Sequence, residues 1–297
     1  MKRKVIQIAD STQLISLPRK WSIAHSIKKG DELEIEEQGS SLIIRTENYV
    51  EFEKAKIFIQ SADRFIRRPI YTLYKLGYDE VEVEFSDPSI IPLLLKEAEG
   101  LLGFEVLEQS NKRVIFRNVA QALDTEFDSV LRRVLLTLIT MAKDTSDSIS
   151  TGDLDALAEI AGRERTNNRL TMFCQRMLNK KGYSDHKKVT GLYQLLGFTE
   201  MMADDYRDVA IYLHKNKPKI SKDEAAAFKM LADLVDKFNS LFHSHDLGGL
   251  IEYKQLKNEA ETLGMSLLLK NSKGSQVIGH YVLTIVDKAH HMAELIS

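Results

Sequence analysis

The stretch LISLPRKWSIAHSIKKGDELEIEE, residues 14–37, changes from apolar to basic and then to acidic. Its apolar start is typical of a strand, and Pro18 predicts the opening of a short helix, because proline lacks the N–H that would go unused there. The turn at Gly30 precedes a segment in which Leu33 and Ile35 alternate with acids, which is typical of a half-buried strand. We therefore expect the N-terminal part of the chain to consist of strands and turns around one short helix.

Charge is segregated within this N-terminal part. Residues 31–37 carry five acids, whereas residues 1–30 carry one acid, Asp10, and seven bases. The bases are Lys2, Arg3, Lys4, Arg19, Lys20, Lys28 and Lys29. Such segregation indicates opposed faces, and a basic face can neutralise DNA phosphates and release their counterions. The alternative is a solvated surface on which the charges are unevenly spread.

The order of these features resembles the SpoVT/AbrB/MazE swapped-hairpin family. A strand runs into Leu17-Pro18, a short basic helix follows, and Lys28-Lys29-Gly30-Asp31 leads into the alternating strand. The resemblance implies that two chains interlock their hairpins into one dimeric β-barrel whose basic side binds DNA. A segment this short cannot bury enough surface alone, so an obligate homodimer makes physical sense. The predicted DNA-binding residues are Arg3, Lys4, Arg19, Lys20 and Lys28.

The composition of the whole chain limits the class of protein. Its 297 residues have a formal net charge of −2, which excludes a uniformly basic coat but not a local basic patch. The single cysteine, Cys174, excludes an internal disulfide framework and fits a reducing cytoplasm. The start lacks the apolar stretch of a signal peptide, and no run of roughly 18 apolar residues occurs. We expect a cytoplasmic protein without direct membrane insertion.

Residues 49–119 alternate between strand and helix patterns. The expected elements are strands at 57–59 and 81–85, helices at 62–76 and 87–102, and a hairpin of 104–107 with 114–116. Such alternation predicts a small α/β linker domain. The pattern by itself sets no strand order.

Residues 120–297 are helical in pattern throughout. Apolar residues recur at helical spacing in three segments, the Asn-Lys-Pro break at 216–218 follows, and three more such segments come after it. The sequence SKDE, just after the break, is a capping box that opens the fourth helix. We therefore predict tandem three-helix bundles, with repeats at about 124–217 and 221–297.

Acidic residues stand out at corresponding places in the two helical repeats. Glu200 and Asp204 are four residues apart, so both carboxylates fall on one face of a helix. Asp287 occupies the corresponding place in the second repeat, with His291 four residues on. Like charges at this spacing repel unless a cation lies between them. That cation could be a metal ion held by oxygen ligands, or a basic side chain such as Arg207.

A carboxylate pair on the third helix of a duplicated three-helix unit resembles the PhoU family of phosphate-uptake regulators. The resemblance implies Glu200, Asp204 and Asp287 as metal ligands on the bundle surface, with a divalent or iron-type metal ion as the one candidate cofactor. The residues alone require no cofactor. With the swapped-hairpin start, the chain resembles an archaeal architecture of PhoU-type transcriptional regulators.

These observations predict a multidomain α+β protein in three parts. The parts are an N-terminal swapped-hairpin β-barrel that forms a dimer (1–48), a small α/β middle domain (49–119) and C-terminal tandem three-helix bundles (120–297).

The predicted function is that of a DNA-binding transcriptional regulator of phosphate uptake with a helical sensor or relay domain. Its expected partners are DNA, a second copy of the chain, and phosphate transporter or signalling proteins. The alternative is an adaptor that dimerises through the hairpins without binding DNA. We expect no enzyme, because the chain has no Gly-rich phosphate loop, HExxH or GxSxG motif, and no general base beside a convincing metal site.

Overall fold

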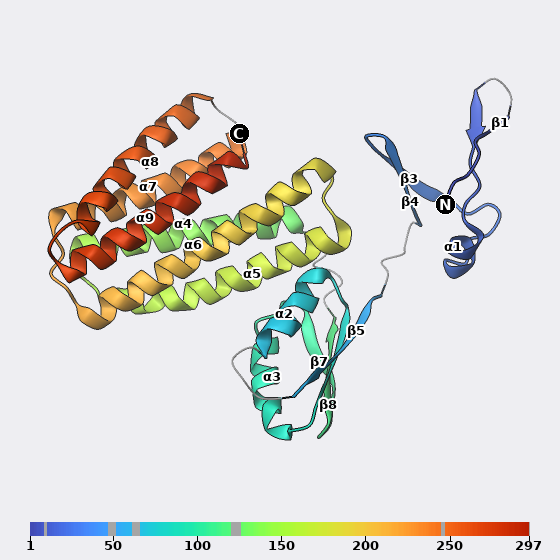
Figure 1. Cartoon of the computed structure of the whole chain (residues 1–297), viewed down its shortest axis with the longest axis horizontal. Coiled ribbons are helices and arrows are strands. Elements are labelled where there is room, and N and C mark those ends of the chain that lie inside the picture. Colours follow the sequence, from blue (N-terminus) through green and yellow to red (C-terminus); the bar gives the residue numbers. More distant parts are fainter. Residues whose placement is uncertain (9–10, 47–51, 61–65, 120–125, 245–246, 297) are drawn as a thin grey trace. The chain divides into compact units, whose positions relative to one another are not determined.

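The chain divides into two compact units, Met1–Phe52 and Glu53–Ser297 (Figure 1). The computed structural model describes residues 1–8, 11–46, 52–60, 66–119, 126–244 and 247–296. The multidomain α+β class predicted from the sequence is confirmed, because small sheets precede a long helical part. Within the described residues, no helix is both long and apolar enough to cross a membrane.

The first unit contains two hairpins with a short helix between them. Its elements are β1 (Ile6–Ile8), β2 (Thr12–Leu14), α1 (Arg19–Ala24), β3 (Leu33–Gln38) and β4 (Ser41–Thr46). Strand β1 pairs with β2 and β3 with β4, both antiparallel, so that each hairpin is a sheet of its own. Pro18 caps α1 at its N-terminus, and Gly39 supplies the positive φ of +60° in the turn between β3 and β4.

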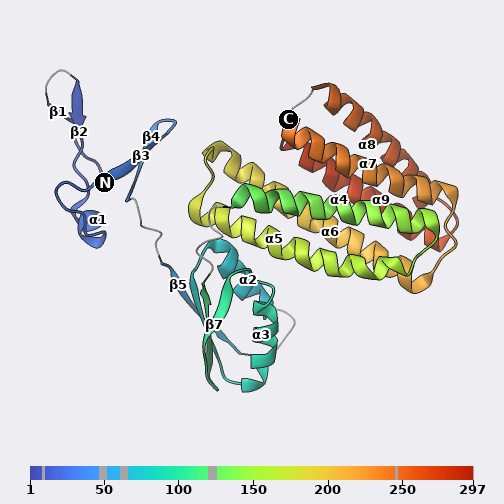
Figure 2. The ribbon, with the colours of Figure 1, turned by 180° about the vertical axis from the view of Figure 1, so that it is seen from behind.

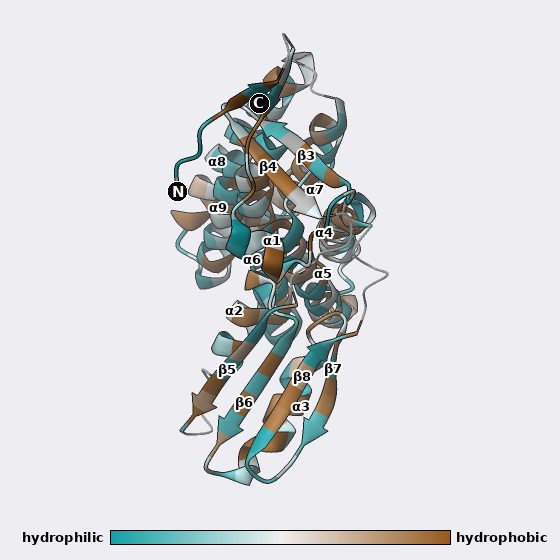
Figure 3. Cartoon of the chain, turned by 90° about the vertical axis from the view of Figure 1, so that its right-hand side faces the viewer, coloured by the Kyte–Doolittle hydropathy of each residue, from teal (hydrophilic) through white to brown (hydrophobic). Residues whose placement is uncertain are grey.

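The second unit begins with an α/β layer. Its elements are β5 (Lys54–Ile59), α2 (Arg67–Leu76), β6 (Glu80–Phe85), η1 (Pro88–Ile90), α3 (Ile91–Ala98), β7 (Phe104–Gln109) and β8 (Arg113–Asn118). The strands lie side by side in the order β5-β6-β8-β7, seen face-on in Figure 3. Only β5 and β6 run parallel among these described strands, and α2 and α3 cover one face (Figure 1).

The two faces of this sheet differ in chemistry because side chains alternate along β6. Val81 and Val83 are fully buried in the core under the helices. On the other face, Glu80 lies 2.9 Å from Lys54, and neighbouring carboxylates of β6 pair with bases of β5 and β8. The exposed side of the sheet is therefore held by a ladder of cross-strand ion pairs, rather than by apolar contacts.

The rest of the second unit is helical. Its elements are α4 (Phe127–Thr151), η3 (Ala156–Glu159), α5 (Ile160–Lys181), η4 (His186–Lys188), α6 (Val189–Asn216), α7 (Lys222–Ser244), α8 (Leu247–Leu268) and α9 (Lys273–Glu294). Helices α4–α6 and α7–α9 form two successive three-helix sets, joined where α4 packs on α7 and α6 on α9 (Figure 2). The Ser221 amide donates a hydrogen bond to the Glu224 carboxylate (2.6 Å), as the predicted capping box requires.

Helices α8 and α9 approach each other closely because each has a glycine at the contact. A Cβ added to Gly279 would lie 2.5 Å from the backbone nitrogen of Leu268 and 2.8 Å from the carbonyl oxygen of Gly264. A Cβ added to Gly264 would lie 2.8 Å from a methyl carbon of Val282. The two backbones therefore touch at a distance that a side chain at either glycine would prevent.

The α/β layer is attached to the helical part at the C-terminal end of α2. Helix α2 ends at Gly77, which has a left-handed φ of +103°, and a Cβ there would lie 3.1 Å from the Cβ of Lys180. Carbonyl groups at a helix C-terminus attract cations and N–H donors. The Asn179 amide of α5 accordingly donates to the carbonyl of Lys75 (2.7 Å).

Arg176 of α5 occupies the centre of this contact. The side chain is 1% exposed, and its guanidinium donates to the carbonyls of Tyr74 (3.0 Å) and Tyr78 (2.6 Å) and to the carboxylate of Asp79 (2.8 Å). It also lies 5.2 Å from the ring centroid of Tyr74 and 5.4 Å from that of Phe104. A buried charge is tolerated when it is paired and hydrogen-bonded, as Arg176 is here.

Candidate nucleic-acid interface and helical acidic site

The first unit forms hairpins without a core. None of the residues within 1–52 whose burial the structure describes is buried, although this unit carries large apolar side chains. The exposed ones include Val5, Ile6, Ile8, Leu14, Ile15, Ile23, Ile35 and Leu42. Isolated two-stranded hairpins are at best marginally stable in water. These apolar side chains therefore need a surface that one copy of the unit does not supply.

The five basic residues predicted to bind DNA all lie on the surface of this unit. Arg3 and Lys4 precede β1, Arg19 and Lys20 form the first turn of α1, and Lys28 follows that helix. None of them forms an ion pair with another residue that the structure describes. Their charges are therefore available to an anionic partner. Their role in DNA binding stays a prediction.

On the helical side, Glu200 and Asp204 lie on α6 as predicted, but in different surroundings. Burial raises the pKa of Glu200, and the nearby charges of Lys75 and Arg67 act against that increase. The side chain of Asp204 is more open and pairs with Arg207, one helical turn on. A metal ion binds deprotonated carboxylates, so it would compete with a proton at Glu200 and with the Arg207 guanidinium at Asp204.

Arg207 is the centre of an ion network between α5 and α6. Its guanidinium contacts Glu164 (3.0 Å), Asp204 (2.5 Å) and Asp208 (2.8 Å). Burial alone would lower the pKa of Arg207, but the hydrogen bond to Asp208 and the charges of Asp204 and Glu164 raise it overall. Glu164 is 5% exposed, and burial raises its pKa, while Arg207 counteracts that effect. The Arg207 guanidinium therefore supplies the cation that the acidic stripe requires.

Asp287 of α9 is not part of this network. Its carboxylate is mostly exposed, and its contact is with His291 of the same helix (3.8 Å). Between α6 and α9, Asp205 instead forms an ion pair with Lys288 (2.7 Å), and the side chains of the two residues are 18% and 12% exposed. The sequence reasoning missed this pair, because pairing between distant segments leaves no signal in a single sequence.

The geometry does not fit the metal site that the sequence resemblance implies. Among the described residues, no group of three or more His, Cys, Asp or Glu side chains could hold a metal ion. Arg207 already neutralises Asp204, and Asp287, at the corresponding place in the second repeat, contacts His291 of its own helix. We derive no step through a metal, and the three residues stay predicted ligands.

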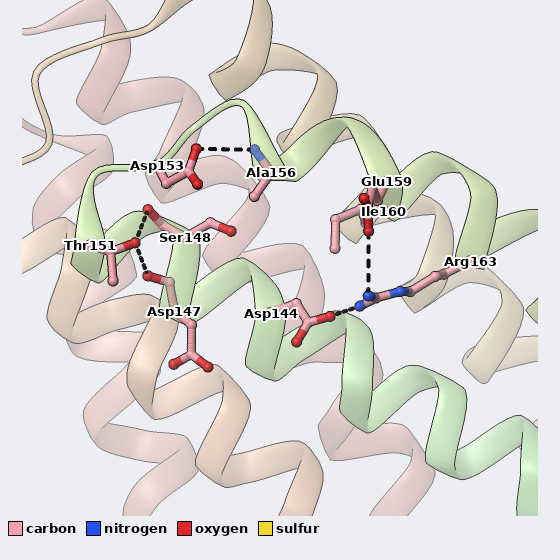
Figure 4. Close-up of a pocket in the computed structure, with 9 residues that line it drawn as sticks. All are labelled: Asp144, Asp147, Ser148, Thr151, Asp153, Ala156, Glu159, Ile160 and Arg163. Carbon is pink, nitrogen blue, oxygen red and sulfur yellow. Dashed lines mark hydrogen bonds and ion pairs between the residues drawn. The ribbon is translucent and has the colours of Figure 1, made fainter.

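A second group of acids surrounds a small cavity of about 240 Å³ at the end of α4 (Figure 4). Arg163 pairs there with Asp144, and the carboxylate of Asp153 accepts a hydrogen bond from the amide of Ala156 (3.3 Å). The Thr151 hydroxyl donates to a backbone carbonyl one turn earlier in α4 (2.9 Å). These contacts stabilise the turn that connects α4 to α5.

Comparison with known proteins gives different matches for the N-terminal segment and for the helical part of the chain. Residues 6–52 match the family described as antidote-toxin recognition MazE, bacterial antitoxin. A search of curated proteins finds no match.

Among solved structures, the phosphate transport system regulatory protein PhoU from Streptococcus pneumoniae matches with 16% identity and a TM-score of 0.44. The match covers 59% of this chain and 90% of that one, and it falls on the helical part. At that distance, the likeness does not transfer the function of that protein. The N-terminal segment of the chain is thus similar to the MazE antitoxin family, as its sequence predicts.

Proposed function

We propose that the chain is a homodimeric, cytoplasmic transcriptional regulator. Its N-terminal unit binds DNA, and its helical part relays a signal about phosphate uptake through transporter or signalling proteins. The observation that carries the proposal is that no residue within 1–52 whose burial the structure describes is buried, in a unit that nevertheless forms regular hairpins.

The exposed apolar side chains are sufficient to drive association of two copies. Fully burying an aliphatic side chain contributes about 1.5–3 kcal/mol, so covering a half-exposed one contributes about 1 kcal/mol. With eight such side chains in each copy, a dimer gains roughly 16 kcal/mol before association costs of about 4–15 kcal/mol. A second copy is the natural partner, because the match to the MazE family covers the same residues.

The charge of the unit supports DNA as the ligand. Arg3, Lys4, Arg19, Lys20 and Lys28 are exposed and form no ion pair with other described residues. A dimer presents two sets of these cations, and each phosphate contact adds to the affinity by releasing a counterion. The link to phosphate uptake rests on the sequence resemblance of the helical part, and the ion network around Arg207 is compatible with a relay that holds no metal.

The dimer is tested by placing a charge on an exposed strand residue. Ile35 is 64% exposed in a single copy, so Ile35→Asp removes little packing within that copy but places a carboxylate in the proposed interface. Ile251 of α8 is 63% exposed and serves as the matched control. Light scattering on a sizing column is expected to show a dimer for the wild type and Ile251→Asp, and a monomer for Ile35→Asp. A monomeric wild type would refute the proposal.

DNA binding is tested with mobility shifts over a salt series. Replacing Arg19 and Lys20 by alanine removes four cations from a dimer, so the slope of log affinity against log salt is expected to fall by roughly 3–4. The control replaces Lys215 and Lys219, two exposed lysines of the second unit. An unchanged slope would remove these residues from the interface. No retention of DNA by an intact dimer would favour the adaptor that dimerises without binding DNA.

A further inference from the structure

A cavity of about 560 Å³ lies at one end of the helical part, and its lining includes no residue of the acidic site on α6 or of the small cavity at the end of α4. The first turns of α4, the start of α6, the end of α7 and the residues that follow α9 surround it. Its volume falls within the range of about 300–1,000 Å³ that is typical of small-molecule sites.

The inner wall of this end cavity is apolar. Leu131, Leu192 and Leu195 are buried at its base, and Phe242 and Ile296 are half-buried at its sides. Such a wall favours the apolar body of a ligand, because contact with it removes hydrocarbon surface from water.

The rim of the end cavity is basic. Arg132, Lys187 and Lys188 are exposed there and form no ion pair with any residue that the structure describes. Among the described residues that line the cavity, Asp128 supplies the one side-chain carboxylate, and it accepts a hydrogen bond from the Tyr183 hydroxyl (3.0 Å). Three cations thus face one carboxylate, and the rim favours an anion.

Gly191 gives the end cavity an open side on α6. A Cβ added at this position, in the first turn of α6, would meet no atom within 4 Å. Glycine is a poorer helix former than alanine, so helix propensity does not account for its presence here. Its lack of a side chain keeps room beside the apolar wall.

We propose that the end cavity binds a small amphipathic anion. The apolar body lies against Leu131, Leu192 and Leu195, and a single carboxylate or phosphate group pairs with the cations of the rim. This inference does not depend on DNA binding or on the dimer.

The first test uses calorimetric titration of the full chain with decanoate, decyl phosphate, decyltrimethylammonium and inorganic phosphate. Binding of one or both of the decyl anions with little or no binding of the other two probes is expected, and the stronger of the two decyl anions identifies the anionic group. Equal binding of decyltrimethylammonium would overturn the charge argument. Equal binding of inorganic phosphate would overturn the role of the apolar wall, and the absence of all binding would overturn the proposal.

The second test fills the cavity from within. Gly191→Met extends a side chain into the open space and is expected to weaken binding of the better decyl anion at least tenfold. Gly197→Met is the matched control, because Gly197 lies on the same helix, has open space beside it and does not line the cavity. Because methionine is a better helix former than glycine, both variants are expected to keep the thermal stability of the wild type or exceed it. Equal affinity in the two variants would place the binding elsewhere.

The third test removes charge without filling space. Replacing Lys187 and Lys188 by glutamine is expected to weaken binding of the same decyl anion at least fivefold and to reduce its dependence on salt. Replacing Lys215 and Lys219 in the same way is the control. Unchanged affinity after loss of both rim lysines would contradict the assignment of the anionic group to this rim.

Discussion

Replacing Arg176 by methionine is expected to destabilise the second unit strongly while leaving the first unit unaffected. Methionine keeps much of the length and the apolar stem of the side chain, so the change removes mainly the charge and the donors. The carbonyls of Tyr74 and Tyr78 lose their guanidinium donor, and Asp79, which is 6% exposed, loses one of its cations.

The size of the loss in unfolding free energy depends on the partners that Asp79 keeps after the substitution. Removing one member of a buried ion pair costs about 3–5 kcal/mol, because the other charge stays buried. Lys180 still contacts Asp79, and the Glu53 amide still donates to it (3.0 Å), so the lower end of this range applies. A loss of about 3 kcal/mol in a unit of this size lowers Tm by roughly 6–12 °C.

The chain offers a separate optical signal for each unit. Trp21, its single tryptophan, lies in the first unit, so its fluorescence follows that unit during heating. The far-ultraviolet circular dichroism signal is dominated by the helices of the second unit. For Arg176→Met, we expect the dichroism midpoint to fall by the amount given above and the fluorescence midpoint to stay where it is.

A matched variant on the same helix separates charge from burial. Arg165 of α5 is exposed, and Arg165→Met is expected to change the unfolding free energy by less than about 0.5 kcal/mol. If Arg176→Met lowered the dichroism midpoint by no more than Arg165→Met does, Arg176 would not fix the α/β layer to α5. An equal fall of both optical midpoints would contradict the division into two units.

Three further predictions concern the second unit. Gly279→Ala is expected to lower the free energy of unfolding by about 1–3 kcal/mol, because α8 and α9 would have to separate. Gly197→Ala, which meets open space, should raise it by about 0.5–1 kcal/mol. Thermal unfolding of both variants checks this prediction. The hydrogen bond from Lys54 lowers the pKa of Glu80, so the stability gap between wild type and Glu80→Gln should be full at neutral pH and close as the pH falls below 4.5 in urea titrations. Arg207→Gln removes the cation from its acids and should increase the thermal shift that Mn²⁺ produces.

The elements of the fold could be predicted because each has a local signal. The alternation of apolar and acidic residues predicted β6, and the capping box predicted the start of α7. The break at 216–218 predicted the boundary between the two sets of three helices. The order of strands in the α/β layer had no such signal, because β8 enters between β6 and β7 through contacts between distant segments.

The candidate site was predictable to the extent that it depends on spacing within one segment. Glu200 and Asp204 share a face of α6, as their separation of four residues required, and Arg207 was visible as a nearby cation. That Glu164 would join Arg207 depends on the packing of α5 on α6. Arg176 carried no signal at all, because an arginine within an apolar helical segment is read as a surface residue until its partners on α2 are known.

The two ion networks of α5 explain why the α/β layer and the helices form one compact unit, although the sequence divides them at residue 119. Glu164 of α5 forms an ion pair with Arg207 of α6. Arg176 of α5 donates a hydrogen bond to the carbonyl of Tyr74, near the end of α2. Displacing α5 in either direction would leave a buried charge unpaired, at a cost of several kcal/mol. A change on the α6 side that moved α5 would therefore carry the α/β layer with it. The boundary at residue 119 stays a prediction, and the two ion networks of α5 lie within the compact unit Glu53–Ser297.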